Sequence, residues 1–547
     1  MRLLFNRFRS PGAWAFILLV AGVPLLALNW AVASNSGGGS LPAAGGRYVE
    51  GDIGPAPERI NPLFAANTGP EADLAGLIFS GLTRTGPSGE SQPDLAEDWV
   101  ASIDGTSFTF DLRQDVLWQD GQPFTADDVL FTARTFAVPG VKGDPATAEV
   151  WRRARVDKIG LYTVVFQFSS SFAPFLAYSS AGILPKHLLG KDSPEQLVSD
   201  QFNRHPVGTG PYRLQSLTAS GAELARYTAY HLGTPYLDHI SMRFLKDNQT
   251  LIGALRSHQV DGGILPPPLA SSQLDSLRGT GHTLISGERP AYSLVYLNLN
   301  IAQFQDVAVR QALSLATDRN GLVQQVMDGQ ATAADVPLPP GTWTSAGSPP
   351  DGGQSAARQA LQKAGWALDA NGVQRRQGIS LTFTLQTTDD PQRRATADAL
   401  ARGWAAIGVK ANVQTVDEAT LLSNILLPHK YEAVLYGWDP GPDPDPFPAW
   451  HSSQKEQQGS NLSGYSSARA DQLLEAARQT ADPVDRAQIY GSFADVFRQD
   501  VPAVVLFFPR FVYVLPQRLT GVRLGLLYSP TDRFSGVEAW SMETRRS

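Results

Sequence analysis

Apolar and polar residues alternate in short segments of this chain, and apolar residues at helical spacing follow many of those segments. Phe108, Phe110 and Leu112 alternate with polar residues, which predicts a half-buried β-strand. Thr125, followed by Asp128, forms an acidic version of a capping box, which predicts that a helix begins there. Strand and helix patterns of this kind alternate along the chain, as is typical of an α/β fold.

The same order of patterns starts again near residue 291, without a fixed-period repeat. The predicted elements are a strand around 292–296, helices that begin at Asp306 and at Asp482-Pro483, and a buried strand over the proline-bounded apolar run 504–508. Two blocks of this kind indicate two α/β lobes. A chain of 547 residues also exceeds what one hydrophobic core usually supports.

The N-terminal segment has the pattern of an export signal. Arg2, Arg7 and Arg9 precede a run of small and apolar residues from Ala13 to Leu28, and Ala-Val-Ala ends the segment at 33. The run is also long enough to span a bilayer as an uncleaved anchor, with its positive end in the cytoplasm. Both alternatives place the remaining chain outside the cytoplasm, in the periplasm or at the outer face of the membrane.

Composition and motif searches exclude several functional classes. Hydrophobic residues make up 42% of the chain and charged residues 18%, which is globular composition. The net charge is -7, with no basic block beyond the N-terminus, so nucleic acid is not an expected partner. The chain has no cysteine, its histidines are scattered, and it lacks the motifs of serine hydrolases and zinc proteases. We therefore expect neither catalytic residues nor a cofactor nor a metal site.

A set of motifs occurs in a fixed order between about residues 48 and 508. The longest is VLWQDGQPFTADDV, from Val116 to Val129. The others include NPL at 61–63, IFSGL at 78–82, PDLAEDW at 93–99, PVGTGPY at 206–212, VRQAL at 309–313, AGW at 364–366 and DPD at 443–445. Together they resemble extracellular solute-binding protein family 5, the substrate-binding proteins of bacterial ABC importers for peptides, dipeptides and oligopeptides.

The resemblance implies a bilobal α/β clamshell of the type II periplasmic-binding-protein kind, with an extra third domain and an N-terminal signal or anchor helix before it. The implied organisation is a signal peptide or anchor over 1–33, a flexible linker over 34–47, lobe I over 48–83 and 201–288, the additional domain of lobe I over 84–200, lobe II over 289–508, and a return to lobe I with the C-terminal tail over 509–547.

The segment 435–446 lies where the family places an acidic residue that pairs with the ammonium group of a bound peptide. A buried ammonium group requires a carboxylate partner of this kind. The candidates are Asp443, Asp439 and Asp445, in that order, and the prolines between them stiffen the loop. The alternative is an Asp-Pro-rich surface turn that contacts no ligand.

Three further residues are candidates for contact with a substrate. Trp438 and Tyr465 are expected to line the cleft, although core packing is an equally good interpretation of both. Asn298 follows a predicted strand near the expected hinge, where a structural asparagine is the alternative.

The resemblance implies a monomeric receptor that encloses a peptide or another small solute and delivers it to the permease subunits of an ABC transporter. An oligosaccharide ligand is the alternative within this class, because Trp343, Trp404, Trp438 and Trp450 could stack on sugars. An exported hydrolase or a scaffold that uses the same fold is the alternative outside the class.

Overall fold

The computed structural model describes residues 40–65, 68–138, 144–339, 352–456 and 459–546. The predicted signal or anchor segment lies outside the described residues, as does the first part of the expected linker. Ser40–Ala43 of that linker form strand β1, which pairs with β23 (Glu543–Arg546). In the part of the chain that is described, no helix combines the length and the apolar character needed to cross a bilayer.

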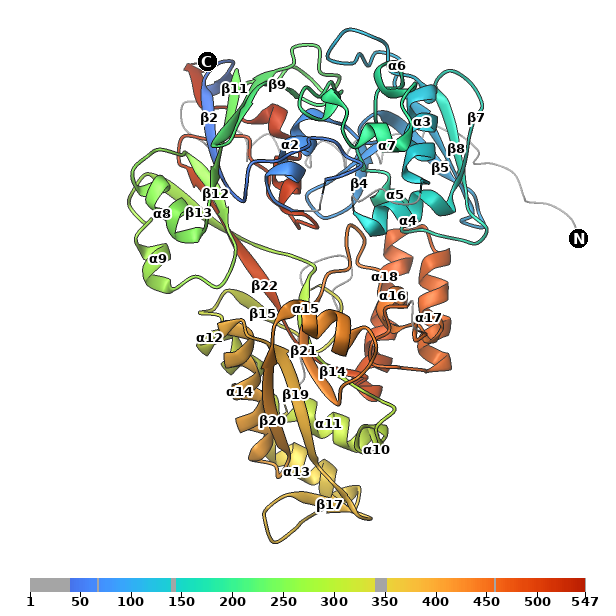
Figure 1. Cartoon of the computed structure of the whole chain (residues 1–547), viewed down its shortest axis with the longest axis vertical. Coiled ribbons are helices and arrows are strands. Elements are labelled where there is room, and N and C mark those ends of the chain that lie inside the picture. Colours follow the sequence, from blue (N-terminus) through green and yellow to red (C-terminus); the bar gives the residue numbers. More distant parts are fainter. Residues whose placement is uncertain (1–39, 66–67, 139–143, 340–351, 457–458, 547) are drawn as a thin grey trace, which may run out of the picture.

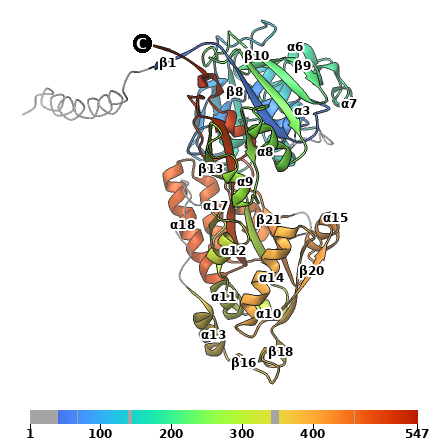
Figure 2. The ribbon, with the colours of Figure 1, turned by 90° about the vertical axis from the view of Figure 1, so that its left-hand side faces the viewer.

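Two lobes are built on one continuous series of hydrogen-bonded strands (Figure 1 and Figure 2). Their order is β20-β19-β21-β14-β22-β12-β2-β11-β10-β9. The lobe II strands are β14 (Tyr292–Leu297), β19 (Thr382–Thr388), β20 (Lys410–Val416) and β21 (Ala433–Trp438). The lobe I strands are β2 (Arg47–Ile53), β9 (Tyr212–Thr218), β10 (Gly221–Arg226), β11 (His239–Leu245) and β12 (Gly262–Leu265). The fold is therefore the bilobal α/β clamshell.

Strand β22 (Ala503–Pro516) crosses the hinge and belongs to both lobes. The strand predicted over 504–508 is too short, because β22 continues through Pro509. Its first part pairs with β14, and its second part pairs with β12 and β13 (His282–Glu288). Pro509 lies opposite Ala331 of β15 (Ala331–Ala333), where β22 changes partners. A proline lacks the N–H group, and a strand tolerates this loss best where its ladder is interrupted.

Helices cover both faces of the lobe II sheet. Leu294 and Tyr296 of β14 pack in a core with α17 (Ala468–Gln479) and α18 (Pro483–Asp500), and the strand predicted around 292–296 is confirmed. Val295 and Leu297 face a second core with α11 (Val307–Leu315), α13 (Gln354–Lys363) and α14 (Pro391–Ala405). Burial on both faces is typical of sheets with parallel strands, and β19 is parallel to β20 and β21.

The additional domain of lobe I contains a four-stranded antiparallel sheet in the order β5-β6-β8-β7. Phe108 and Phe110 of β6 are fully buried, which confirms the predicted strand face. Trp151 meets Phe166 edge to face with 5.4 Å between ring centroids, so aromatic side chains form this core. The elements are β5 (Ala96–Ala101), β6 (Ser107–Leu112), β7 (Arg155–Lys158), β8 (Thr163–Gln167), α3 (Ala126–Phe136), α4 (Pro145–Arg153), α5 (Phe175–Tyr178), α6 (Lys186–Leu189) and α7 (Pro194–Leu197).

The predicted helix starts are confirmed by their capping contacts. The Asp128 carboxylate accepts a hydrogen bond from the Thr125 backbone N–H at 2.9 Å and completes the capping box of α3. Asp306 and Asp482 are the N-cap residues of α11 and α18, and their carboxylates accept hydrogen bonds from backbone N–H groups of the first turn. The remaining helices are α2 (Pro70–Ile78), α8 (Asn248–Arg256) and α9 (Ser271–Asp275) in lobe I, and α10 (Ala302–Gln305), α12 (Arg319–Gln325), α15 (Glu418–Thr420) and α16 (Phe447–Trp450) in lobe II.

The PVGTGPY motif packs its glycines against the end of α2. The Gly210 N–H donates to the Ile78 carbonyl at 2.8 Å. A Cβ atom at Gly208 would lie 1.8 Å from the same oxygen, so only glycine permits this approach. The motif thus fixes α2, whose other end faces the space between the lobes.

Candidate functional site

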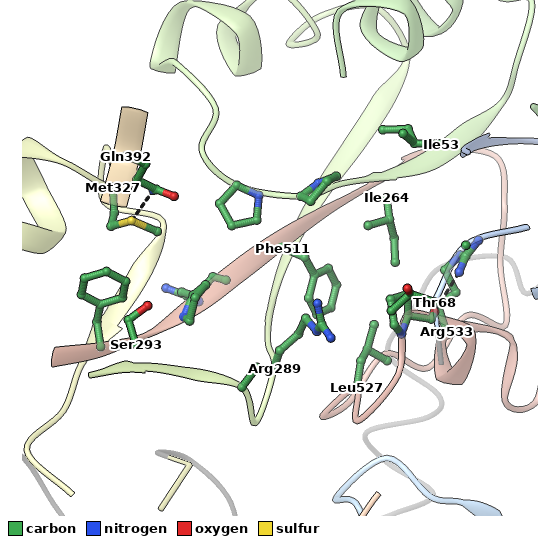
Figure 3. A pocket seen from close by; sticks show the side chains of 18 of the residues that line it. Ile53, Thr68, Ile264, Arg289, Ser293, Met327, Gln392, Phe511, Leu527 and Arg533 are labelled. Carbon is green, nitrogen blue, oxygen red and sulfur yellow. Dashed lines mark hydrogen bonds between the residues drawn. The ribbon is translucent and has the colours of Figure 1, made fainter. Parts of the chain in front are cut away.

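A cavity of about 470 Å³ lies between the lobes beside β22 (Figure 3). Figure 3 shows Met327 and Gln392 of lobe II on one side, Ile53 and Thr68 of lobe I on the other, and Phe511 of β22 between them. A volume of this size falls within the range of about 300–1,000 Å³ that is usual for small-molecule sites. We call this cavity the hinge pocket.

The ends of strands from both lobes position the lining of the hinge pocket. In lobe I, residues 51–53 end β2, and Ile264 lies near the end of β12, which is parallel to β2. In lobe II, Leu435 and Tyr436 lie in β21, and the first turn of α14 follows the parallel strand β19. Ligands of open α/β sheets bind outside the carboxyl ends of parallel strands, and the hinge pocket has this position in both lobes.

Four arginines and two aspartates line the hinge pocket. Arg289 forms an ion pair with Asp439, with 3.2 Å between Nη2 and Oδ2. Arg393 lies over the ring of Tyr436, 4.2 Å from its centroid, and is 3.5 Å from a carboxylate oxygen of Glu418. The other two arginines are Arg510 and Arg533. The side chain of Arg533 is buried in lobe I.

Arg533 joins an acidic residue of strand β2 to an acidic residue of helix α2 in the lobe I wall. Its Nε donates to Glu50 at 2.8 Å and its Nη1 donates to Asp73 at 2.9 Å. Burial raises the pKa of Glu50, although the Arg533 guanidinium acts in the opposite direction. Asp52 lies beside this network, and its Oδ2 makes no hydrogen bond within the described residues. Burial and then the Asp73 carboxylate raise the pKa of Asp52 well above its ordinary value.

A second cavity of about 210 Å³ lies between the additional domain and the loop that follows β21. Tyr178 and Asp144 contribute to its lining from lobe I, and Asp439 and Gly441 contribute from lobe II. Asp439 thus lines the second cavity while its partner Arg289 lines the hinge pocket. A ligand that enters this region meets a carboxylate and a guanidinium group side by side.

The structure separates the three aspartates of the Asp-Pro loop. The Asp443 carboxylate accepts hydrogen bonds from Arg486 Nη1 at 2.8 Å and Nη2 at 2.6 Å, and both residues are buried in lobe II. Asp445 accepts from Arg478 Nε at 2.7 Å and is also buried. Asp439 alone of the three lines one of the two cavities described above. The loop therefore combines an exposed carboxylate with two buried ion pairs.

The partner of Asp445 also touches lobe I. The Arg478 guanidinium lies 5.3 Å from the ring centroid of Phe172 in the additional domain. The Arg478 carbonyl accepts a hydrogen bond from the Ala173 N–H at 2.8 Å. The ion pair with Asp445 therefore positions an arginine that contacts the other lobe.

The other three predicted site residues lie apart from the lining of both cavities. Tyr465 is buried, and its hydroxyl donates to Asp500 at 2.5 Å. Asn298 is buried, and its Nδ2 donates to the Tyr431 carbonyl at 2.8 Å. Trp438 ends β21, is half-buried and packs against the lobe II core. Trp404 and Trp450, which could have stacked on a sugar, are fully buried, and Trp343 lies outside the described residues.

Sequence patterns did not single out Arg289, Arg510 or Asp52. A usable signal existed for Asp52. Both Asp52 and Glu50 are acidic residues within a strand in which most of the other residues are buried or half-buried. Acidic residues in such a strand require partners or a function. The two arginines carry no local signal, since the pairing of β13 with β22 brings them to one cavity.

The chain matches a known protein family over most of its length. The sequence profile described as "Bacterial extracellular solute-binding proteins, family 5 Middle" matches residues 90–460. The chain is 27% identical over 541 residues to the oligopeptide-binding protein AppA of Bacillus subtilis, which covers 96% of this chain and 97% of that protein. It is 28% identical over 484 residues to the dipeptide-binding protein of Escherichia coli. The matched region covers 82% of this chain and 87% of that protein.

Solved structures of similar proteins share the fold. The structure of AppA from Bacillus subtilis in complex with a nonapeptide matches with a TM-score of 0.69 at 27% identity, and covers 92% of this chain and 100% of that one. The structure of NikZ from Campylobacter jejuni in complex with Ni(L-His) matches with a TM-score of 0.70 at 26% identity, and covers 90% of this chain and 99% of that one.

Proposed function

This chain belongs to the bacterial extracellular solute-binding proteins of family 5, and from that premise we propose that it is the peptide-binding receptor of an ABC importer. The observation that carries the proposal is the hinge pocket, which both lobes line at the ends of their strands and in which charges of both signs are available. The similarity to the oligopeptide-binding and dipeptide-binding proteins supports a peptide as the ligand.

In this function the lobes close on the ligand and open to release it. The β22 strand is the connection about which such a movement can occur, and the contact of Arg478 with Phe172 joins the two lobes. The receptor acts as a monomer that delivers its ligand to the permease subunits in the membrane. Binding rather than catalysis is its task, as it is for its family.

Asp439 is the residue in this proposal that takes the ammonium group of the peptide. Its carboxylate is half-exposed and lies at the junction of the two cavities. Asp443 and Asp445 support the loop through their buried ion pairs with Arg486 and Arg478. The ammonium group of a peptide can replace the Arg289 guanidinium as the partner of the Asp439 carboxylate. Arg289 then keeps a partner if an anionic group of the ligand binds to it.

Titration calorimetry with unmodified peptides, N-acetylated peptides and a linear oligosaccharide tests this function. We expect the purified protein to bind peptides with a free amino group and to reject the sugar. Asp439→Asn should weaken binding of those peptides about 10- to 100-fold, the effect of losing a charged hydrogen-bond partner, and should leave binding of acetylated peptides nearly unchanged.

A matched control exists in lobe I. Asp238 forms an ion pair with Arg226 at 3.0 Å, with 41% and 28% of the two side chains exposed, close to the 49% and 28% of Asp439 and Arg289. Asp238→Asn should bind all ligands as the parent protein does. Binding of the oligosaccharide without binding of any peptide would refute the proposed function.

The N-terminal segment 1–33 is the export element in this proposal, as a signal peptide or as an uncleaved anchor. A reporter that is active only outside the cytoplasm, fused after Gly46, should be active in cells. Substituting glutamate for Arg2, Arg7 and Arg9 together should reduce that activity, because the positive head directs the orientation of the apolar run. An inactive reporter in cells that contain the intact fusion protein would contradict the localisation.

A further inference from the structure

The additional domain of lobe I contacts lobe II at a place apart from both cavities (Figure 1). Phe172 and Ala173 of the additional domain lie between β8 and α5, and Arg478 lies in the last turn of α17. Neither Phe172 nor Arg478 is among the described residues that line the hinge pocket or the second cavity. We call these three residues the latch. Because the latch lies outside the cavities, it acts on a ligand through the arrangement of the lobes.

A backbone hydrogen bond fixes how the latch fits together. The Ala173 N–H donates to the Arg478 carbonyl at 2.8 Å. The last carbonyl groups of a helix have no partner within the helix, so lobe I here supplies a donor that α17 needs. The turn between β5 and β6 approaches the same helix end, since a Cβ atom at Gly105 would lie 3.4 Å from the Gln479 carbonyl oxygen. The end of α17 therefore packs against the additional domain through its backbone as well as its side chains.

Lobe II holds the Arg478 side chain in position for this contact. Its Nε donates to Asp445 at 2.7 Å, and its guanidinium group lies 3.7 Å from the ring centroid of Phe447 in α16. Both partners belong to lobe II, so they orient the guanidinium group without help from lobe I. The Phe172 ring of the other lobe lies 5.3 Å from that group, within the range of a cation–π interaction.

A second guanidinium group lies against the same ring. Arg153, at the end of α4, is 5.1 Å from the ring centroid of Phe172. Burial and then the charge of Arg478 lower the pKa of Arg153, so the two cations repel each other across the contact. The Asp445 carboxylate offsets this repulsion because it forms an ion pair with Arg478. Asp445 is therefore a positioning residue of the latch.

The latch and the proposed ligand contact depend on one loop. Asp439 and Asp445 lie in the same loop, and the prolines between them restrict its backbone. Gly441 of this loop and Tyr178 of the additional domain both line the second cavity. A ligand that orders the loop at Asp439 thus also orders the segment that positions Arg478.

We propose that the additional domain retains the ligand by holding lobe II in place, so that the contact of Phe172 and Ala173 with Arg478 stabilises the closed receptor and sets the lifetime of every bound ligand alike. The additional domain thereby has a task of its own, separate from ligand recognition. The statement about ligands rests on the proposed function. The statement about the lobes can be tested without a ligand.

Distances between the lobes test the latch in the ligand-free, full-length protein. The chain has no cysteine, so Ser220→Cys in lobe I and Leu368→Cys in lobe II, both at exposed positions, provide two sites for spin labels. Phe172→Leu keeps an apolar side chain and removes the ring. We expect this variant to lower the ratio of short to long distances about 3- to 30-fold, the effect of losing a cation–π contact.

Phe168→Leu is the matched control for that variant. Phe168 is buried in the same aromatic core, with 5.6 Å between its ring centroid and that of Phe172. It should leave the ratio of distances as in the parent protein, because the arginines of the contact lie against Phe172.

Dissociation rates of two unlike peptides test the effect on the ligand. Stopped-flow fluorescence with trialanine and trilysine should show that Phe172→Leu and Arg478→Lys each accelerate dissociation about 3- to 30-fold, by the same factor for both peptides. Arg498→Lys is the control, since Arg498 ends α18 and pairs with Asp335 within lobe II. The two side chains of that pair are 24% and 5% exposed, close to the 16% and 6% of Arg478 and Asp445.

The outcomes separate the latch from the proposed function. Equal distance ratios in Phe172→Leu and Phe168→Leu, or unchanged dissociation in both Phe172→Leu and Arg478→Lys, would overturn the inference and leave peptide binding intact. Acceleration for only one of the two peptides would also overturn it, because the residues would then act on the ligand itself. If neither peptide binds, the proposed function fails and the distances still decide on the latch. Should Phe172→Leu not fold, Arg478→Lys with its control provides the same decision in both measurements.

Discussion

Replacement of Arg533 by methionine should lower the free energy of unfolding by about 3–5 kcal/mol, the usual result of leaving buried charges without a partner. Arg533 is 2% exposed and holds the carboxylates of Glu50 and Asp73, which are themselves buried. It also ties the C-terminal segment 530–534 to β2 and α2 of lobe I. A loss of this size is a large fraction of the stability of a typical domain.

Urea denaturation followed by circular dichroism measures the effect. Arg518→Met serves as the control, because Arg518 forms an ion pair that is 65% exposed on the arginine side and should contribute at most about 1 kcal/mol. Equal stability of the two variants would mean that the buried network contributes no more than a surface pair.

The loss in Arg533→Met should also depend on pH. Burial raises the pKa of Glu50, and removal of the guanidinium group raises it further. A carboxyl group whose pKa is higher in the folded state than in the unfolded state destabilises the fold as the pH rises through that interval. The difference between Arg533→Met and the parent protein should therefore be larger at about pH 8 than at about pH 5.

Asp443→Asn should cost about 3–5 kcal/mol of stability, because it leaves the Arg486 guanidinium buried without this carboxylate. Burial lowers the pKa of Arg486, but the Asp443 carboxylate acts in the opposite direction and the net shift is upward. Asp439→Asn, which removes a half-exposed carboxylate, should cost no more than about 1 kcal/mol. The two variants should therefore have different effects. We expect Asp439→Asn to reduce peptide affinity and Asp443→Asn to reduce stability.

Thermal denaturation and calorimetry on the two variants decide between the alternatives for the loop. If Asp443→Asn is as stable as the parent protein but no longer distinguishes free from acetylated peptides, Asp443 is the ammonium contact. If it is destabilised and, where folded, still distinguishes them, the Asp443 carboxylate serves the fold. Conditions below the unfolding transition of both variants must be used for the affinity measurements.

Local signals in the sequence predicted much of the secondary structure. Thr125 with Asp128, Asp306 and Asp482 each mark a helix start, and the structure confirms all of them. A capping contact involves residues within a few positions of each other, so the sequence contains both partners. The strands predicted at 108–112 and around 292–296 are confirmed for the same reason, since a strand presents every second residue to one face.

Strand β22 is longer than the local pattern predicted. The prolines around 504–508 predict a stop, yet the chain continues as a strand because its partner changes at Pro509 from β14 to β13. No local pattern contains the positions of those partners. The hinge therefore became visible only in the tertiary structure.

The sequence by itself determined the two α/β blocks, the helix starts and the resemblance to a family of solute-binding proteins, because these depend on neighbouring residues or on ordered motifs. It also identified the Asp-Pro loop as a notable acidic segment. Only the tertiary structure decided which of its carboxylates are paired, since Asp443 meets Arg486 and Asp445 meets Arg478 from helices that follow later in the chain. The same holds for Arg289 and Arg510, which the pairing of β13 with β22 brings to one cavity. The effect of a charge depends on its distance from other charges and from water, and the fold sets both distances.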